Sequence, residues 1–438
     1  MKYSVITFGC RVNQADSLKF EEDLRAAGAS SAPPPAADLV IVNTCSVTAA
    51  ADQGARQAIR RVARDNPSAR IIVTGCYATR RPDEVAALPN VVCVVPNDDK
   101  PRLLPLVGAD LRVGPGRTHG SAPTTANRLG DGPCGAPIEP GVAGRTAFTL
   151  RVQTGCAEPC AYCIIPATRG RPRSVSINEL LSEIHRIVTA GFKEIALTGV
   201  HLGSYGRDLE PATSLIELLR AFDDVSERRA TLSGSRRDVL FRISSLEPMD
   251  CSREIVDLVA GSAAFAPHFH LPLQHASNRL LSAMRRPYTI DFYSSLVDGI
   301  RARIPHASIG SDVIVGFPGE TDEDFERLAA YLERSPLTHI HVFPYSDRPG
   351  TPASTMPCKV AGTVVRERGR RVREIGQRLT TRFRDSQVGT THRALTLEDG
   401  SLVVTGNYLK LRIPPGEPRN QWVHVRVASH DDGELLRG

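Results

Sequence analysis

The sequence predicts an α/β protein with an N-terminal doubly wound parallel sheet, a central partial (β/α)6 barrel and a small C-terminal antiparallel β-barrel. Two observations lead to this prediction. Short runs rich in β-branched residues alternate with helical stretches over most of the chain, as in parallel sheets covered by helices. From residue 391 onward, short alternating runs are separated by turn residues, which is typical of a small antiparallel barrel.

Length and composition indicate a folded protein of two or three domains. The chain has 438 residues, of which 41% are hydrophobic and 23% are charged. No apolar run approaches the roughly 20 residues of a membrane helix, and the first residues form a strand pattern rather than a signal peptide. We therefore expect a cytoplasmic protein without membrane contact, whose ten cysteines are not a disulfide framework. The net charge of +6 is compatible with a polyanionic partner.

Residues 1–111 are predicted to form the first domain. Its strand candidates are KYSVITF, ADLVIVNT, ARIIVTG and NVVCVVP, with helices near 14–28, 47–64 and 82–88. Cys10, Cys45 and Cys76 each follow the last apolar position of a strand. Ligands of parallel sheets lie beyond the carboxyl ends of the strands, so we expect these thiols to converge at one edge. The alternative, three isolated buried thiols, stays open on spacing alone.

Residues 112–145 contain many Gly, Pro, Ser and Thr residues and are predicted to be a flexible linker. The central domain is then predicted over residues 146–375. Its strand candidates are FTLRVQ, EIALTGV, FRISSL, HFHLPL, SIGSDVIVGF and HIHVFPY, with a helix after each of the first five. One long helix is expected near 277–304, and Ser176 and Thr321 are expected near helix starts. Active sites of such barrels lie at the carboxyl ends of the strands.

A loop with the spacing C-x3-C-x2-C follows the first strand of this barrel. It contains Cys156, Cys160 and Cys163. Three thiolates spaced this closely can bind one soft metal centre and leave a position open to an outside ligand. A zinc knuckle with a distant fourth ligand is the alternative, but no His or Cys follows at finger spacing.

The C-terminal region, residues 376–438, is predicted to be a separate domain. Residues 360–389, which lead into it, hold eight arginines against three acidic residues, a local charge of +5. Arginine forms bidentate contacts with phosphates, so a nucleic-acid contact is one interpretation. A solvated helix face is the other interpretation, and it is the commoner case for a single arginine-rich helix.

Four motifs occur in order along the chain: GC-x-V-N-Q, N-T-C-S-V-T, T-G-C-Y-A and the C-x3-C-x2-C loop with an aromatic residue before its last cysteine. Together they resemble the motifs of the methylthiotransferases, which are radical S-adenosylmethionine (SAM) enzymes with a second cluster. The resemblance implies SAM and two [4Fe–4S] clusters, one on Cys156, Cys160 and Cys163 and an auxiliary one on Cys10, Cys45 and Cys76. It also implies that a rim of polar residues contacts SAM. These cofactor-binding candidates are Tyr162, Ser244, Glu247, Gln274 and Asp312. No catalytic residue beyond the cluster ligands is assigned.

The resemblance also implies a tRNA substrate, an electron donor such as flavodoxin or ferredoxin, and a C-terminal RNA-binding domain of the TRAM type. LTGVHLGSYG, FGCRVNQAD and VFPYSDRPGTPA look most like the subgroup that modifies carbon 2 of N6-threonylcarbamoyladenosine at position 37. The alternatives are isopentenyladenosine in tRNA, an aspartate of a ribosomal protein, and a nonenzymatic RNA-binding iron–sulfur protein. Family members often carry Ser-Gly-Ser where this chain has His275-Ala276-Ser277. Candidates to contact the adenine side chain are His201, Ser204, Tyr205, Arg207, Arg169, Arg171 and Arg173.

Overall fold

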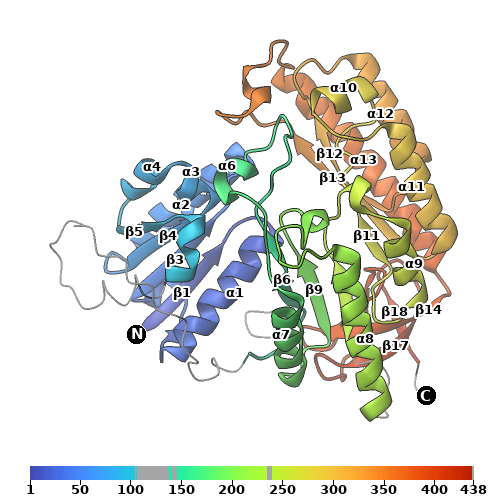
Figure 1. The fold of residues 1–438 in the computed structure, drawn as a ribbon, viewed down its shortest axis with the longest axis horizontal. Helices are drawn as coiled ribbons and strands as arrows, with labels where there is room; N and C mark the ends of the chain where they lie inside the picture. Colours follow the sequence, from blue (N-terminus) through green and yellow to red (C-terminus); the bar gives the residue numbers. More distant parts are fainter. Residues whose placement is uncertain (104, 106–137, 141–145, 234–238, 437–438) are drawn as a thin grey trace. The chain divides into compact units, whose positions relative to one another are not determined.

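The computed structural model describes residues 1–103, 105, 138–140, 146–233 and 239–436. The chain divides into two compact units (Figure 1). The first contains Met1–Ile138 and Ala167–Gly170, and the second contains Glu139–Pro166 and Arg171–Gly438. Most of the predicted linker at 112–145 lies outside the described residues.

The first unit contains a five-stranded parallel sheet in the order β2-β1-β3-β4-β5, which confirms the predicted parallel sheet. Its strands are β1 (Lys2–Thr7), β2 (Ser30–Ser31), β3 (Leu39–Thr44), β4 (Arg70–Gly75) and β5 (Val91–Val95). Only the short strand β2 was not predicted, because its two serines carry no apolar pattern. The strand order reverses between β1 and β3, and ligands of such sheets bind at this kind of switch point.

Helices cover both faces of this sheet. They are α1 (Arg11–Ala26), α2 (Ala49–Asp65), α3 (Cys76–Arg80) and α4 (Pro82–Ala86), with 3-10 turns η1 (Pro34–Ala36) and η2 (Asn97–Arg102). Alternate residues of β3 face opposite sides of the sheet. Val40 belongs to one buried cluster, together with Ile59 of α2. Ile41 belongs to the other cluster, with Phe20 of α1. Burial on both faces explains why the central strands are almost entirely apolar.

The second unit contains the six predicted barrel strands in chain order. They are β6 (Phe148–Arg151), β9 (Glu194–Thr198), β10 (Leu240–Ile243), β11 (His268–His270), β12 (Ser308–Val315) and β13 (His339–Pro344). They form two three-stranded parallel sheets, β10-β9-β6 and β11-β12-β13. The sheets meet where the Leu246 amide donates to the His270 carbonyl at 2.9 Å. The partial (β/α)6 barrel is therefore confirmed.

The helices of this unit are mostly those that the sequence predicted. They are α6 (Ile165–Arg169, which crosses into the first unit), α7 (Ile177–Thr189), α8 (Leu215–Ser233), α9 (Arg253–Gly261), α10 (Asn278–Ala283), α11 (Ile290–Arg303) and α12 (Asp322–Arg334). Ser176 and Thr321 each close a capping box, with Glu179 and Asp324 respectively. The single helix expected near 277–304 was wrong. It is divided into α10 and α11 by a turn that contains Arg285 at φ 58° and then Pro287.

The chain ends in a long helix and a curled antiparallel sheet. Helix α13 spans Gly362–Gln387, so the predicted boundary between residues 375 and 376 falls inside a helix. The sheet has the order β16-β15-β14-β17-β18. Its strands are β14 (Thr391–Leu397), β15 (Leu402–Thr405), β16 (Lys410–Arg412), β17 (Trp422–Val427) and β18 (Gly433–Leu435). An isolated β-bridge between the backbones of Arg412 and Asp432 links the two edges of this sheet.

The buried guanidinium of Arg242 links this sheet to the barrel. Arg242 of β10 lies 2.8 Å from Glu194 of β9, and these side chains are 1% and 7% exposed. The same guanidinium donates to the Gly406 carbonyl at 2.8 Å and lies over the ring of Tyr408. Tyr408 also stacks on His268 at 5.0 Å between ring centroids. The C-terminal sheet therefore supplies partners that the barrel core needs.

Candidate metal centres and cofactor site

The C-x3-C-x2-C loop runs between two short elements, β7 (Gln153–Thr154) and α6. Inside it, the Cys163 amide donates to the Cys160 carbonyl at 3.2 Å, and the Glu158 amide lies 3.4 Å from the Cys156 sulfur. Burial raises the pKa of Cys163 to about 12, and the neighbouring Cys160 and Cys156 thiolates add to this shift. The three thiols are therefore close together. A bound metal centre offsets this mutual repulsion, because its positive charge stabilises the deprotonated thiols that coordinate it.

Arg286 supports this loop from the turn between α10 and α11. Its side chain is 2% exposed and forms an ion pair with Glu247. Its Nη1 donates to the Cys160 sulfur at 3.2 Å, and its Nε donates to the Tyr288 hydroxyl at 3.2 Å. Sequence reasoning missed Arg286, because the expected single helix near 277–304 hid the turn in which it lies; Pro287 was the one local signal of that turn. Glu247, expected to contact SAM, has its carboxylate paired with this buried cation.

His201 lies on the other side of the loop, beside Cys156. Its Nε2 is 2.9 Å from Asp250, and its side chain is 4% exposed. Burial lowers its pKa, but hydrogen bonds with Asp250 and Cys156 outweigh burial and raise the pKa to about 9. Gly203 permits the close approach, because a Cβ there would lie 2.0 Å from the Asp250 carboxylate. His201 was expected to contact the substrate; the structure places it beside Cys156 of the cluster loop, and the substrate contact stays a prediction.

Three more residues of the loop after β9 were expected to contact the substrate. Two of them stabilise this loop, and the third lies on the surface. The Ser204 hydroxyl donates to the His201 carbonyl at 2.8 Å. Tyr205 is 1% exposed, and its hydroxyl donates to the Val175 carbonyl at 2.7 Å. Arg207 is 64% exposed and lies 3.5 Å from Asp250. Ser204 and Tyr205 therefore stabilise the loop after β9.

A cluster of histidines lies on β11 and β13, which flank β12. The Asp312 carboxylate on β12 is 3.1 Å from His270 Nε2 and 3.2 Å from His341 Nδ1. The other nitrogen of His270 is 2.8 Å from the Ser245 hydroxyl. Burial alone would raise the pKa of Asp312, but the two histidines lower it to about 2.

This cluster, His270–Asp312–His341, faces away from the covering helices. The neighbouring Ser311 points to helix α11, where Tyr293 donates to it at 3.1 Å. Since side chains alternate along a strand, Asp312 faces the inside of the curved sheet. Sequence reasoning identified Asp312 alone, although the repeated H-x-H pattern of β11 and β13 was a signal. These groups could hold a cation or bind a polar ligand.

The remaining SAM candidates lie where the strands end. Ser244 follows β10, and its hydroxyl is buried without a hydrogen-bond partner among the described residues. Gln274 follows β11 at φ 66°, and its amide donates to the Asp312 carbonyl at 2.9 Å. Tyr162 packs against the buried cluster that contains Met284 and Phe317. Their contacts with SAM stay predictions.

The N-terminal cysteines follow β1, β3 and β4 in the first unit. Burial raises the pKa of Cys45 to about 11, and the thiolates of Cys10 and Cys76 contribute to the shift. Gly9, at φ +84°, lies so close that a Cβ would be 2.5 Å from the Cys45 sulfur. The structure therefore brings these thiols together at the strand ends, and the donor set fits an iron–sulfur centre.

Arg169 also belongs to the first unit. Its guanidinium is 3% exposed and lies 3.2 Å from Asp16. It also donates to the Asn13 side chain at 2.5 Å. These contacts occupy an arginine that we expected to read the substrate.

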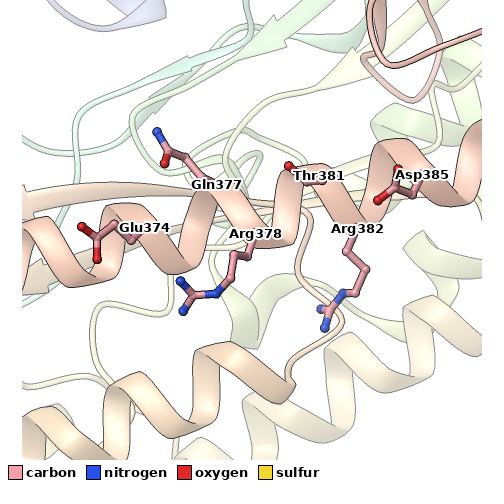
Figure 2. Close-up of a pocket in the computed structure, with 6 residues that line it drawn as sticks. All are labelled: Glu374, Gln377, Arg378, Thr381, Arg382 and Asp385. Carbon is pink, nitrogen blue, oxygen red and sulfur yellow. The ribbon is translucent and has the colours of Figure 1, made fainter.

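The arginines of α13 are largely paired with acidic residues. Arg368 lies 2.9 Å from Glu320, Arg370 lies 2.5 Å from Glu374, and Arg384 lies 2.6 Å from Asp431. A shallow groove along α13 is lined by six residues (Figure 2). They are Glu374, Gln377, Arg378, Thr381, Arg382 and Asp385. Arg378 pairs with Glu333 at 2.8 Å, so much of the charge that suggested phosphate binding is neutralised within the protein.

The fold and the C-x3-C-x2-C loop define a radical SAM enzyme. Residues 150–332 match the family described as the radical SAM superfamily. The TsrM radical SAM methyltransferase of Kitasatospora setae shares the fold, with a TM-score of 0.57 and 17% identity over 81% of this chain and 73% of that chain. No helix among the described residues is long and apolar enough to cross a membrane.

Related sequences identify the family within the radical SAM enzymes to which the chain belongs. Residues 2–96 match the uncharacterized protein family UPF0004. "Threonylcarbamoyladenosine tRNA methylthiotransferase MtaB" of Aquifex aeolicus is 35% identical over 94% of this chain and 96% of its own length. "tRNA-2-methylthio-N(6)-dimethylallyladenosine synthase 1" of Mycobacterium marinum is 33% identical over 98% of this chain and 81% of its own length. The chain belongs to the radical SAM methylthiotransferase family, whose cofactors include SAM and a [4Fe–4S] cluster.

Proposed function

We propose that this enzyme adds a methylthio group to carbon 2 of N6-threonylcarbamoyladenosine at position 37 of tRNA. The observation that carries the proposal is the 35% identity over 94% of the chain to a relative named for this substrate. The polar cluster inside the barrel supports the same choice. The alternative is isopentenyladenosine, because a relative named for that nucleoside is 33% identical.

In this proposal, two metal centres have separate chemical roles. Cys156, Cys160 and Cys163 would hold the cluster that binds SAM, and the N-terminal cysteines would hold an auxiliary cluster. When bound, these groups supply reductive cleavage of SAM and a sulfur atom for an unactivated C–H position. The chain's own residues hold the thiolates: Arg286 donates to Cys160 at 3.2 Å, and His201 hydrogen-bonds to Cys156.

Charge inside the barrel favours a polar substrate side chain. The hydrogen bond with Asp312 raises the pKa of His341, whose side chain is 60% exposed. A protonated His341 can pair with the carboxylate of a threonylcarbamoyl group. An isopentenyl group would offer no anion to His341 and would cover this exposed polar ring with hydrocarbon, which costs binding energy.

The substrate is tested by mass spectrometry of tRNA nucleosides from a knockout strain and its complemented twin. The methylthio derivative of threonylcarbamoyladenosine should vanish in the knockout and return on complementation. Methylthio-isopentenyladenosine should stay constant. The opposite pattern would assign the enzyme to the isopentenyladenosine subgroup.

Metal content tests the two centres separately. Anaerobically reconstituted protein should hold two [4Fe–4S] clusters, and replacing either set of three cysteines with alanine should remove one. If the protein with an altered N-terminal set still held both clusters, the auxiliary site would be wrong.

The remaining partners follow from the substrate. We propose that the C-terminal sheet acts as a TRAM-like RNA-binding surface, and that flavodoxin or ferredoxin donates electrons. The cytoplasm is the expected location of an enzyme that modifies tRNA.

A further inference from the structure

A buried group of charges lies next to the N-terminal cysteines. Lys100 lies 2.6 Å from the Asp16 carboxylate, with side chains 6% and 1% exposed. Arg169 lies 3.2 Å from the same carboxylate oxygen and is 3% exposed. One anion therefore faces two cations.

The positive charge of Arg169 acts on the thiols of Cys76 and Cys10 as well as on Asp16. Burial lowers the pKa of Arg169, but Cys76, Asp16 and Cys10 together outweigh burial and raise it. A hydrogen bond between Arg169 and the Cys76 thiolate is part of this effect. A buried guanidinium stays charged, and burying it is costly unless an anion lies nearby. Asp16 is shared with Lys100, and the thiolates of Cys76 and Cys10 are further anions whose charge acts on Arg169.

Arg169 is fixed in this position by the segment that carries it. Thr168 and Arg169 are 2% and 3% exposed. The Asn97 side chain donates to the Thr168 carbonyl at 2.7 Å and lies 3.7 Å from the Cys76 sulfur. The segment Ala167–Gly170 thus packs in the first unit, although the chain reaches it directly from the C-x3-C-x2-C loop.

We infer that Arg169, assisted by Lys100, is a positioning residue that sets the reduction potential and the retention of the cluster on Cys10, Cys45 and Cys76. This inference rests on the proposed function, which places an auxiliary cluster at these thiols. A [4Fe–4S] centre with three thiolate ligands carries a net negative charge, which becomes larger on reduction. A fixed cation beside it stabilises the reduced form, because net charge and hydrogen bonds to sulfur set cluster potentials.

The test uses the full-length protein in which the C-x3-C-x2-C cysteines are alanine, so that only the N-terminal cluster forms. Iron content and a redox titration followed by electron paramagnetic resonance are measured after desalting. Arg169→Gln should shift the midpoint potential to a more negative value and weaken iron retention. Arg169→Lys should keep most of both properties. Arg171→Gln, at an exposed position nearby, should match the parent.

Asp16→Asn separates charge from packing. Removing the anion makes the surroundings more positive, so the midpoint potential should rise, opposite to the shift from Arg169→Gln. Two shifts in the same direction would indicate a structural role and overturn the inference. Equal potentials and iron contents for Arg169→Gln and Arg171→Gln would also overturn it. Absence of any cluster in the parent would instead refute the auxiliary site, and the inference with it.

Discussion

Replacing Arg242 with methionine should loosen the C-terminal sheet from the barrel. The substitution keeps much of the side-chain volume but leaves Glu194 as an unpaired charge that is 7% exposed. Breaking a buried pair in this way costs about 3–5 kcal/mol. The lost hydrogen bond to the Gly406 carbonyl, at 2.8 Å, adds to this cost. Because each 1.4 kcal/mol is about tenfold in an equilibrium, local opening should increase roughly 100-fold or more.

Hydrogen exchange of the β15 and β16 amides measures this opening. Arg303→Met is the matched control, because Arg303 and Asp257 form a surface pair at 3.0 Å with side chains 55% and 46% exposed. Such a pair contributes about 0–1 kcal/mol, so exchange in β15 and β16 should not change. Adding Glu194→Gln to Arg242→Met should recover much of the loss. Unchanged exchange in Arg242→Met, or no recovery in the double variant, would refute the reasoning.

Three further predictions concern the site, pH and RNA. Gly75→Ala places a Cβ 2.2 Å from the Thr44 carbonyl oxygen and should remove iron from the N-terminal set. Gly28→Ala, also at positive φ but in open space, should cost only about 1–2 kcal/mol and keep the iron. Burial lowers the pKa of His275 from 6.5 to about 4, so native stability should fall by up to about 3 kcal/mol as pH drops through this range. Thermal melting should show a smaller acid loss in His275→Gln. Finally, charge reversal of the exposed Lys410 and Arg412 should weaken tRNA binding and its salt dependence in a gel-shift titration.

Each of these has an outcome that contradicts it. Equal iron content in the two glycine variants would show that the close approach at Gly75 is tolerated. An acid loss that is identical in His275→Gln would assign the proton uptake to other groups. Unchanged tRNA affinity after charge reversal would remove β16 from the RNA surface. Point substitutions are better here than deletion of residues 391–438, because deletion would uncover the buried Arg242–Glu194 pair.

The sequence alone determined the order of the elements and the position of both cysteine sets. Strand and helix periodicity are local properties. The sheet of the first unit and the two barrel sheets are parallel with buried faces, so apolar runs predicted nearly all of their strands. Cys10, Cys45 and Cys76 were expected to converge because the carboxyl ends of neighbouring parallel strands share one edge. The capping residues Ser176 and Thr321 were likewise identifiable, since a cap depends on residues within one turn.

Only the tertiary structure decided which charges meet. Arg286 reaches Cys160, and Arg169 reaches Asp16, across more than 100 positions of sequence. Nothing in the local pattern distinguishes such an arginine from an exposed one. The same reason explains α13: its arginines suggested a phosphate-binding face, but acidic residues of α12 and of the C-terminal sheet pair with several of them. Ion pairing depends on which elements become neighbours, and that is settled by packing rather than by spacing along the chain.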